Sequence, residues 1–149
     1  MTLENKTREI SDCMHAIMAE TQLNDKKLMS VFNAFSPPEF HVMMTVGHMG
    51  HCIMSDIAGR MQLSLSSITG IVDKLEAKKI VRRDRSAQDR RIVQVVLTDE
   101  GLKVHKTAME GHLEFVRNLL KTLNPHEQDV FLALFRKIAE VIKAKKARV

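Results

Sequence analysis

The sequence predicts a mostly α-helical fold with two short helices joined by a tight turn and a two-stranded hairpin after them. Apolar residues recur at helical spacing in several stretches that begin with capping residues. Two of these stretches, 55–61 and 64–78, are separated by only two residues. The β-branched runs 80–83 and 92–97 flank an arginine-rich segment, which is typical of a hairpin.

Length and composition limit the class of protein. A chain of 149 residues fits one domain that can bury a core without disulfides. Cys13 and Cys52 are too few for a disulfide framework, so reduced thiols are expected. The N-terminus lacks the basic start and apolar stretch of a secretory signal, and no run of about 18 apolar residues occurs. We therefore expect a soluble cytoplasmic protein without a membrane span.

The first expected helix covers residues 5–33, with a break near Asn24 and Asp25. The next helix begins at the sequence SPPE, where Ser36 can cap, Pro37 fits the first turn and Glu39 completes a capping box. This helix is expected to run to about His48 and to end near the two glycines of residues 47–50.

A helix-turn-helix is expected next. Ser55 is predicted to cap a short helix that ends at about Met61, and Gln62 and Leu63 make the connection. Ser64 is predicted to cap the second helix, which buries one apolar stripe formed by Ile68, Ile71, Val72 and Leu75.

The outer face of this second helix carries small residues: Ser66, Ser67, Thr69 and Gly70. A solvated helix surface usually has better helix formers such as Glu and Lys. Low bulk and hydroxyl groups suit a face that enters a groove of a partner. An ordinary polar surface is the alternative interpretation.

The hairpin carries the chain's excess positive charge. Residues 78–91 hold seven basic and two acidic residues, a net charge of +5 that equals the net charge of the whole chain. Charge localised in this way indicates a polyanionic partner, with a solvated loop as the alternative. A second basic run, residues 143–148, is interpreted as a solvated helix end.

Two long helices complete the chain. Thr98 is predicted to cap the first, which runs to about Leu123, and Asn124, Pro125 and Glu127 start the last helix, which runs to about Lys146. Its apolar set is Val130, Phe131, Leu134, Phe135, Ile138, Val141 and Ile142. The outer helices carry more apolar surface than a small central lobe can cover, which favours a homodimer; packing onto the chain's own helices is the alternative.

Residues 55–101 resemble the MarR family of transcriptional regulators. The resemblance rests on the helix-turn-helix, on the wing sequence DRS…DRR, and on the LTxxG motif at Leu97, Thr98 and Gly101. The order of the outer helices agrees with the family as well, so the resemblance extends over the whole chain. One departure is Lys79, where members often have glycine.

The resemblance implies an obligate homodimer, joined through its N- and C-terminal helices, that binds pseudo-palindromic double-stranded DNA. It implies a recognition helix in the major groove and a wing beside the minor groove. The DNA-binding residues it implies are Ser64, Ser66, Ser67, Thr69, Gly70, Lys74, Arg85, Arg90 and Arg91, with Arg91 inserted in the minor groove. Asp84 and Asp89 are expected to orient the wing arginines. The corresponding division is 1–35 for dimerisation, 36–98 for DNA binding and 99–149 for completion of the dimer interface.

Members of the family commonly respond to a small-molecule effector, an oxidant or a metal, and three weak candidates for such a site exist. Cys13 lies near the reactive thiol of peroxide sensors, but the tyrosines those sensors use are absent, which favours a structural cysteine. His41, His48, His51 and Cys52 form a second group, which His105 and His112 could join; surface or packing roles are favoured and no metal or other cofactor is predicted. The third candidate is an effector pocket that draws on Cys13, Met14, Ile17, Met18, His41, Met44 and His48, although packing in a core is favoured for each methionine individually.

The function predicted is a sequence-specific DNA-binding regulator, a repressor that responds to a ligand or stress. No GxSxG, HExxH, Walker or dinucleotide motif occurs, so no enzymatic activity is expected. A winged-helix module that binds protein is the alternative, and a metal-dependent enzyme built on the histidines is a more distant one.

Overall fold

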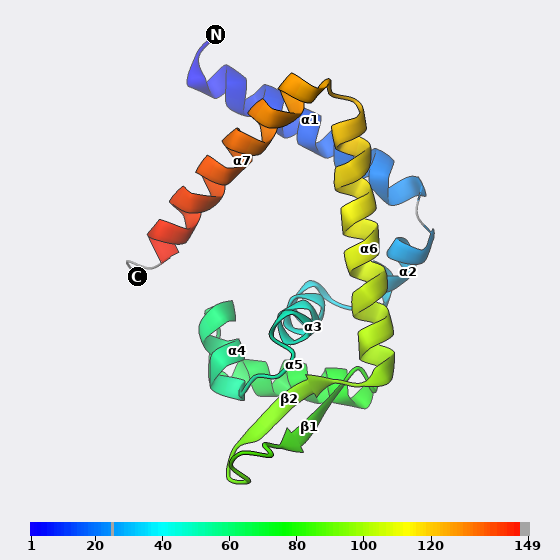
Figure 1. The fold of residues 1–149 in the computed structure, drawn as a ribbon, viewed down its shortest axis with the longest axis vertical. Helices are drawn as coiled ribbons and strands as arrows, with labels where there is room; N and C mark the ends of the chain where they lie inside the picture. Colours follow the sequence, from blue (N-terminus) through cyan, green and yellow to red (C-terminus); the bar gives the residue numbers. More distant parts are fainter. Residues whose placement is uncertain (25, 147–149) are drawn as a thin grey trace. The chain divides into compact units, whose positions relative to one another are not determined.

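Seven α-helices and one two-stranded sheet make up the part of the chain that the structure describes. It is a computed structural model and describes residues 1–24 and 26–146. The elements are α1 (Leu3–Asn24), α2 (Lys26–Ala34), α3 (Pro37–Met49), α4 (Met54–Met61), α5 (Leu65–Ala77), β1 (Val81–Arg85), β2 (Val93–Leu97), α6 (Asp99–Lys121) and α7 (Pro125–Lys146) (Figure 1). The chain divides into two units between Gly111 and His112. The predicted mostly helical fold with a two-stranded wing is confirmed.

The helix expected over residues 5–33 is two helices in the structure. α1 ends at Asn24 and α2 begins at Lys26, on either side of the predicted break. Asp25 lies outside the described residues. From residue 3 to residue 19 every side chain of α1 is exposed in this single chain. The apolar side chains of Ile10, Met14 and Met18 on α1 are therefore largely exposed in this single chain.

The start of α3 is the predicted capping box. The backbone N–H of Ser36 donates to a Glu39 carboxylate oxygen at 2.7 Å, and the N–H of Glu39 donates to the Ser36 hydroxyl at 3.5 Å. The helix ends at Met49, where Gly50 has a φ of 74°. Positive φ favours glycine, so the local sequence fixes both ends of α3.

The predicted cap of α4 is wrong. Ile53, not Ser55, precedes the first helical turn, and it makes no side-chain capping hydrogen bond. The chain turns here because Cys52 pairs with Val95 through two backbone hydrogen bonds, of 3.2 and 2.7 Å. Ile57, four residues after Ile53, is fully buried. Tertiary pairing and burial thus outweigh the better capping residue two positions later.

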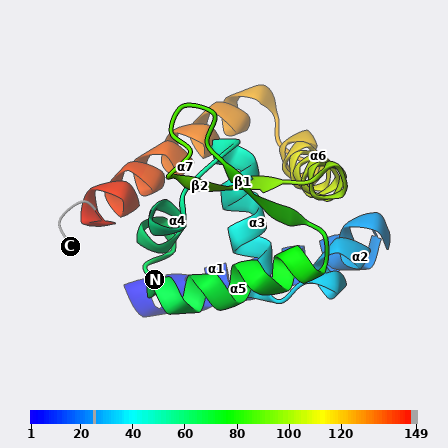
Figure 2. The same ribbon diagram turned by 90° about the horizontal axis from the view of Figure 1, so that it is seen from below.

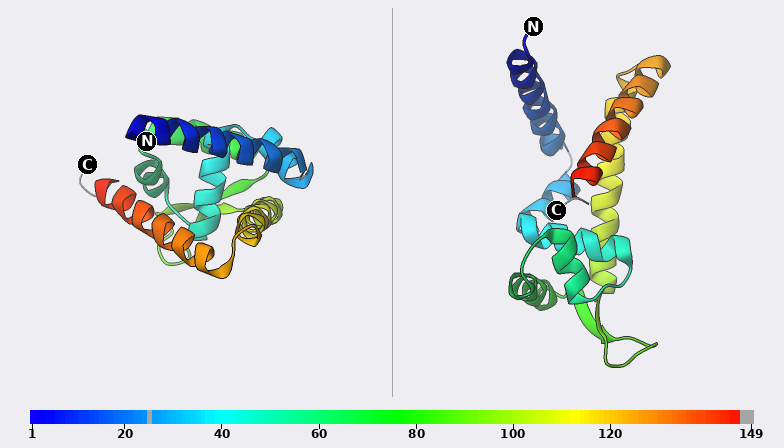
Figure 3. Two further views of the ribbon diagram at one scale, coloured as in Figure 1. Left: turned by 90° about the horizontal axis from the view of Figure 1, so that it is seen from above. Right: turned by 90° about the vertical axis from the view of Figure 1, so that its left-hand side faces the viewer.

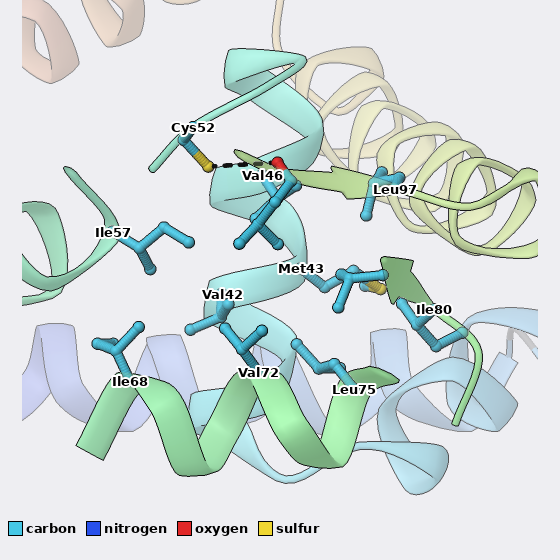
Figure 4. Packing of buried hydrophobic residues seen from close by; sticks show 12 residues of the cluster. Val42, Met43, Val46, Cys52, Ile57, Ile68, Val72, Leu75, Ile80 and Leu97 are labelled. Atoms are coloured by element: carbon cyan, nitrogen blue, oxygen red, sulfur yellow. Dashed lines mark hydrogen bonds between the residues drawn. The ribbon is translucent and has the colours of Figure 1, made fainter. Parts of the chain in front are cut away.

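The second helix of the pair, α5, starts as predicted. Gln62 ends α4 in the left-handed conformation, and Ser64 caps α5 by accepting the Ser67 N–H at 3.2 Å. The inner face of α5 packs against α3 in the lobe formed by α3, α4, α5 and the hairpin, and α5 runs across one end of α3 (Figures 2 and 4). The fully buried side chains that meet there include Val42, Met43 and Val46 of α3 and Ile68, Val72 and Leu75 of α5. Ile71, expected in the same stripe, is only half-buried at its edge.

The first strand of the hairpin runs two residues further toward the tip than predicted, and the second strand begins one residue later than predicted. β1 and β2 pair antiparallel from Val81 opposite Leu97 to Arg85 opposite Val93, so the loop is 86–92 rather than 84–91. The N–H of Ser86 continues the ladder by donating to the Ile92 carbonyl at 2.9 Å. Backbone pairing does not depend on the charge of the side chains, so charged residues stay in the strand. The hairpin projects from α3, α4 and α5 (Figures 1 and 3).

The turn from β2 into α6 explains the LTxxG motif. The Thr98 hydroxyl donates to the carbonyl of Lys79 at 2.6 Å and accepts the N–H of Gly101 at 3.0 Å. This cap holds the start of α6 against Ile80, so close that a Cβ on Gly101 would overlap the Ile80 carbonyl. The close approach of α6 to Ile80 therefore explains both Thr98 and Gly101.

In the second unit, α7 begins with the predicted capping box. The Asn124 N–H donates to Glu127 at 2.8 Å, and the Glu127 N–H donates to the Asn124 side chain at 3.1 Å. Gln128 donates to the carbonyls of Leu120 and Leu123, which closes the turn between the helices. No helix among residues 1–24 and 26–146 is long and apolar enough to cross a membrane.

Candidate nucleic-acid interface

The start of α5 presents a cluster of hydroxyl groups. The Ser64 hydroxyl lies 3.1 Å from that of Ser66 and 2.8 Å from that of Ser67, and Thr69 donates back to the Leu65 carbonyl at 2.9 Å. All four hydroxyl-bearing residues are exposed. They lie at the positive end of the helix dipole, where backbone N–H groups and hydroxyls favour an anion such as a phosphate.

Gly70 and Lys74 lie further along α5 and are also exposed. A Cβ on Gly70 would have no described neighbour within 4 Å. The chain's own packing therefore does not require glycine here, although glycine in a helix costs about 1 kcal/mol relative to alanine. A partner that approaches the α5 backbone closely would explain the residue.

The wing loop, residues 86–92, is held by short-range hydrogen bonds. The buried Ser86 hydroxyl accepts the N–H of Gln88 at 3.2 Å and that of Asp89 at 3.5 Å. The Asp89 carboxylate accepts the backbone N–H of Arg91 at 2.9 Å. Asp89 thus contacts the backbone beside the wing arginines and fixes the loop rather than a guanidinium.

The seven basic residues of segment 78–91 fall into two groups. Three are paired with carboxylates: Lys78 with Glu39, Arg82 with Asp84, and Arg83 with both Asp73 and Glu76. The other four, for which no carboxylate of the described chain lies within 4.0 Å, are Lys79, Arg85, Arg90 and Arg91. The Arg85 guanidinium donates to the Arg90 carbonyl at 3.1 Å.

The unpaired cations lie in the hairpin or directly before it, and the small residues lie on α5. Figure 2 shows that α5 and the hairpin are neighbouring elements of the first unit. The predicted DNA-binding residues of helix and wing are therefore carried by two neighbouring exposed elements. The two predicted orienting residues, Asp84 and Asp89, lie in the hairpin, where Asp84 accepts from Arg82 at 2.8 Å.

Lys78 anchors the end of α5 to the start of α3. Its ammonium donates to the Ala34 carbonyl and to Glu39, both at 2.9 Å, and lies 5.1 Å from the centre of the Phe35 ring. Burial alone would raise the pKa of the Glu39 carboxyl, but the hydrogen bonds from Ser36 and Lys78 outweigh it and lower that pKa below its ordinary value. The buried Glu39 carboxylate therefore accepts hydrogen bonds from both Ser36 and Lys78.

The effector-pocket candidates are dispersed over two helices of the first unit. Cys13, Met14 and Ile17 are exposed on α1, and His41 is exposed on α3. Met44 is partly buried against the core of the lobe. In this single chain the candidate residues of α1 are exposed to solvent. A closed pocket would therefore require another surface that covers them.

The histidines do not gather as one group. His48 of α3 lies 3.4 Å from His105 of α6, between ring nitrogens, with the rings at 84°. Burial, and then the neighbouring His48, lower the pKa of His105. Cys52 points into the core, where burial raises its pKa to about 11. His51 is exposed, and no three His, Cys, Asp or Glu side chains of the described chain are placed to hold a metal ion.

Sequence reasoning missed the inward-facing contacts of this segment. Lys78 and Arg83 counted only as part of a positive cluster, although both are paired with residues of other elements. Asp73 and Glu76 stand three residues apart on α5, a spacing that puts them on one helix face. This spacing indicates that the two carboxylates can bind one cation together. It does not indicate which basic residue binds them.

The comparisons with known proteins agree with this geometry. The MarR family model matches residues 35–93. YfiV of Bacillus subtilis (strain 168), an uncharacterized HTH-type transcriptional regulator, is 35% identical over 127 residues, which are 85% of this chain and 78% of YfiV.

Two solved structures illustrate the shared fold. Streptococcus pneumoniae FabT, solved in complex with DNA, has a TM-score of 0.78 at 19% identity, over 96% of this chain and 99% of FabT. S. aureus MepR, bound to ethidium bromide, has a TM-score of 0.66 at 20% identity, over 95% of this chain and 97% of MepR. Given the family match over the lobe and the identity to YfiV, the chain belongs to the MarR family of winged helix-turn-helix, DNA-binding transcriptional regulators, and is not an enzyme.

Proposed function

We propose that the chain acts as a homodimeric repressor that binds a pseudo-palindromic operator in the cytoplasm and leaves it when an effector binds. Two features together carry this proposal. The small-residue face of α5 is exposed, and the wing has arginines that lack carboxylate partners among the described residues. Each half of the dimer would contact one half-site, because two-fold proteins match two-fold operators.

The small face of α5 is assigned to the major groove. The residues that reach the DNA are Ser64, Ser66, Ser67, Thr69, Gly70 and Lys74. Hydroxyls both donate and accept, so they can meet base edges or phosphates, and low bulk lets the helix backbone approach the bases. Lys74 supplies a charge at the far side of the same face.

The wing is assigned to the adjacent minor groove, with Arg91 inserted and Arg85 and Arg90 near the phosphates. Arginine stays charged at all relevant pH values, and a narrow minor groove concentrates negative potential. Asp89 holds the backbone at Arg91, so the loop is ordered before binding. Order of this kind reduces the entropy lost on binding.

The dimer is assigned to the helices at the two ends of the chain, within residues 1–35 and 99–149. In α1 the exposed apolar side chains include Ile10, Met14 and Met18, and in α7 they include Leu134, Phe135, Ile138, Val141 and Ile142. An apolar surface of this extent is unfavourable in water and marks an interface. A second copy is the simplest cover, since two-fold dimers are the commonest homo-oligomers.

The effector is a small apolar molecule of unknown identity. The candidate residues Cys13, Met14, Ile17, His41, Met44 and His48 lie on α1 and α3, and a second subunit would have to close a pocket around them. Methionines adapt to ligands of different shape. MepR, which has this fold, was solved with ethidium, a small aromatic cation, and this supports a small-molecule effector for the chain.

Selection of bound sequences from random duplex DNA tests the proposal. We expect the purified protein to enrich one pseudo-palindromic sequence, and we expect a mass in solution of two chains. Candidate apolar compounds are then screened for release of that duplex. A protein that enriches no sequence, or that remains monomeric, would contradict the proposal and favour a protein-binding winged helix.

A further inference from the structure

Arg83 lies in the middle of β1, and its side chain contacts α5. Its guanidinium donates to Asp73 at 2.7 Å and to Glu76, two carboxylates on one face of α5. The Arg83 side chain is 26% exposed, against 53% for that of Arg82. Alternate side chains of a strand point to opposite faces, so only one of the two neighbours can turn toward α5.

The backbone of Arg83 is fixed from the other side. Arg83 pairs with Val95 in the hairpin, and Val95 in turn pairs with Cys52. Val95 is fully buried. The Arg83 side chain starts from this fixed backbone and reaches two carboxylates of α5. It therefore connects the base of the wing to α5.

We infer that Arg83 is a positioning residue for DNA binding: it sets the angle between wing and recognition helix so that both meet their grooves together. The inference rests on the proposed use of α5 and the wing at DNA. An exposed ion pair alone contributes little to stability. A shielded arginine with two carboxylates has a defined direction, because its planar guanidinium donates from several N–H groups.

Charge and position make opposite predictions for Asp73 and Glu76. If these carboxylates only add negative charge near the phosphates, their neutralisation tightens DNA binding. If they hold Arg83, their neutralisation makes the wing more mobile. DNA binding is then weaker, because a mobile wing loses more conformational entropy when it binds. The sign of the effect decides between the two.

The experiment uses the full-length protein and the duplex that the wild type selects from a random pool. We expect Asp73→Asn with Glu76→Gln to weaken binding about tenfold, or ~1.4 kcal/mol. In the Arg83→Gln background the same two changes are expected to cause no further loss, since the coupled groups are already separated. Arg83→Lys is expected to retain part of the affinity. Tighter binding of the Asp73→Asn, Glu76→Gln variant, or additive losses, would overturn the inference.

The matched control is Arg82→Gln, which removes the same charge from the preceding residue of β1. Amide ¹⁵N relaxation supplies a readout that needs no DNA. We expect the Gln88 amide to lose order in Arg83→Gln and to keep it in Arg82→Gln, while the Val95 amide is unchanged in both. Equal order at Gln88 in the wild type and both variants would contradict the role of Arg83 even if no duplex is selected. Failure to select a duplex, with Gln88 loosened only in Arg83→Gln, would count against the proposed function alone.

Discussion

Gly101 lies so close to Ile80 that a Cβ on Gly101 would overlap the Ile80 carbonyl oxygen and stand 3.0 Å from its carbonyl carbon. The Thr98 N–H donates to that same carbonyl at 3.0 Å. The chain thus passes from the end of α5, through β1 and β2, and back beside its own starting point at the first turn of α6. The wing is closed at its base by this contact.

Gly101→Ala is expected to destabilise the fold by about 1–3 kcal/mol, the usual cost of forcing an extra carbon into a packed site. Backbone atoms form the obstacle, so no side-chain movement relieves it. Urea unfolding measures the change. Gly59→Ala on α4 is the control, because a Cβ there would have no described neighbour within 4 Å. Equal stability of Gly101→Ala and wild type would contradict the close approach.

Gly70→Ala should separate stability from DNA binding. Alanine is the better helix former, so the variant should be more stable than wild type by about 0.5–1 kcal/mol. DNA affinity should fall, because the added methyl group stands on the face assigned to the major groove. Unfolding and duplex titration are compared on the same sample. A variant that is more stable and binds DNA as tightly as wild type would remove Gly70 from the interface.

Lys79→Gly should relieve backbone strain. Lys79 has a φ of 58°, the left-handed conformation that glycine adopts freely. The expected gain in stability is about 1 kcal/mol. Lys79→Ala removes the same charge without relief of strain and is the control. If both variants unfold at the same urea concentration, the strain at Lys79 has no measurable effect.

The pH dependence of stability should carry a contribution from Glu39. Its pKa in the folded state lies below the ordinary value of 4.5, because the hydrogen bonds from Ser36 and Lys78 outweigh burial. The unfolded state therefore binds the proton more readily, so this contribution is complete above about pH 4.5 and is lost as the pH falls through the folded-state pKa. Glu39→Gln should show a weaker loss of stability in this acid range. Parallel curves for variant and wild type would show that the carboxylate is not stabilised as described.

Several elements were predictable from the sequence because they depend on local chemistry. Ser36 with Glu39 and Asn124 with Glu127 are capping boxes that span three residues and need no distant partner. The apolar stripe of α5 follows from helical spacing alone. The hairpin is predicted from its β-branched runs, but the predicted loop starts two residues and ends one residue before the observed loop, because the prediction assigns charged residues to the tip.

The remaining features depend on contacts between distant residues. Ile53 rather than Ser55 starts α4 because Cys52 pairs with Val95, 43 residues later. The division of the basic segment into paired and unpaired cations could not be read from composition, since Arg82 and Arg83 are adjacent and meet different carboxylates. The sequence shows the total charge of residues 78–91. The structure shows which of these basic residues are paired with carboxylates of the same chain.

Arg91→Ala is expected to weaken binding of the selected duplex by about 1–3 kcal/mol and to reduce its salt dependence by about one phosphate contact. Arg91 has no carboxylate partner among the described residues, so its charge is available to DNA. Arg82→Ala, which removes a charge already paired with Asp84, should change both quantities less.

The most direct test of DNA binding by the small face of α5 and the wing arginines is the salt titration of that duplex with wild type and Arg91→Ala. We predict that the logarithm of the wild-type association constant falls steeply and linearly with the logarithm of the salt concentration, as bound counterions are released. We predict a shallower slope for Arg91→Ala. A flat profile for the wild type, or identical curves for the two proteins, would contradict the account.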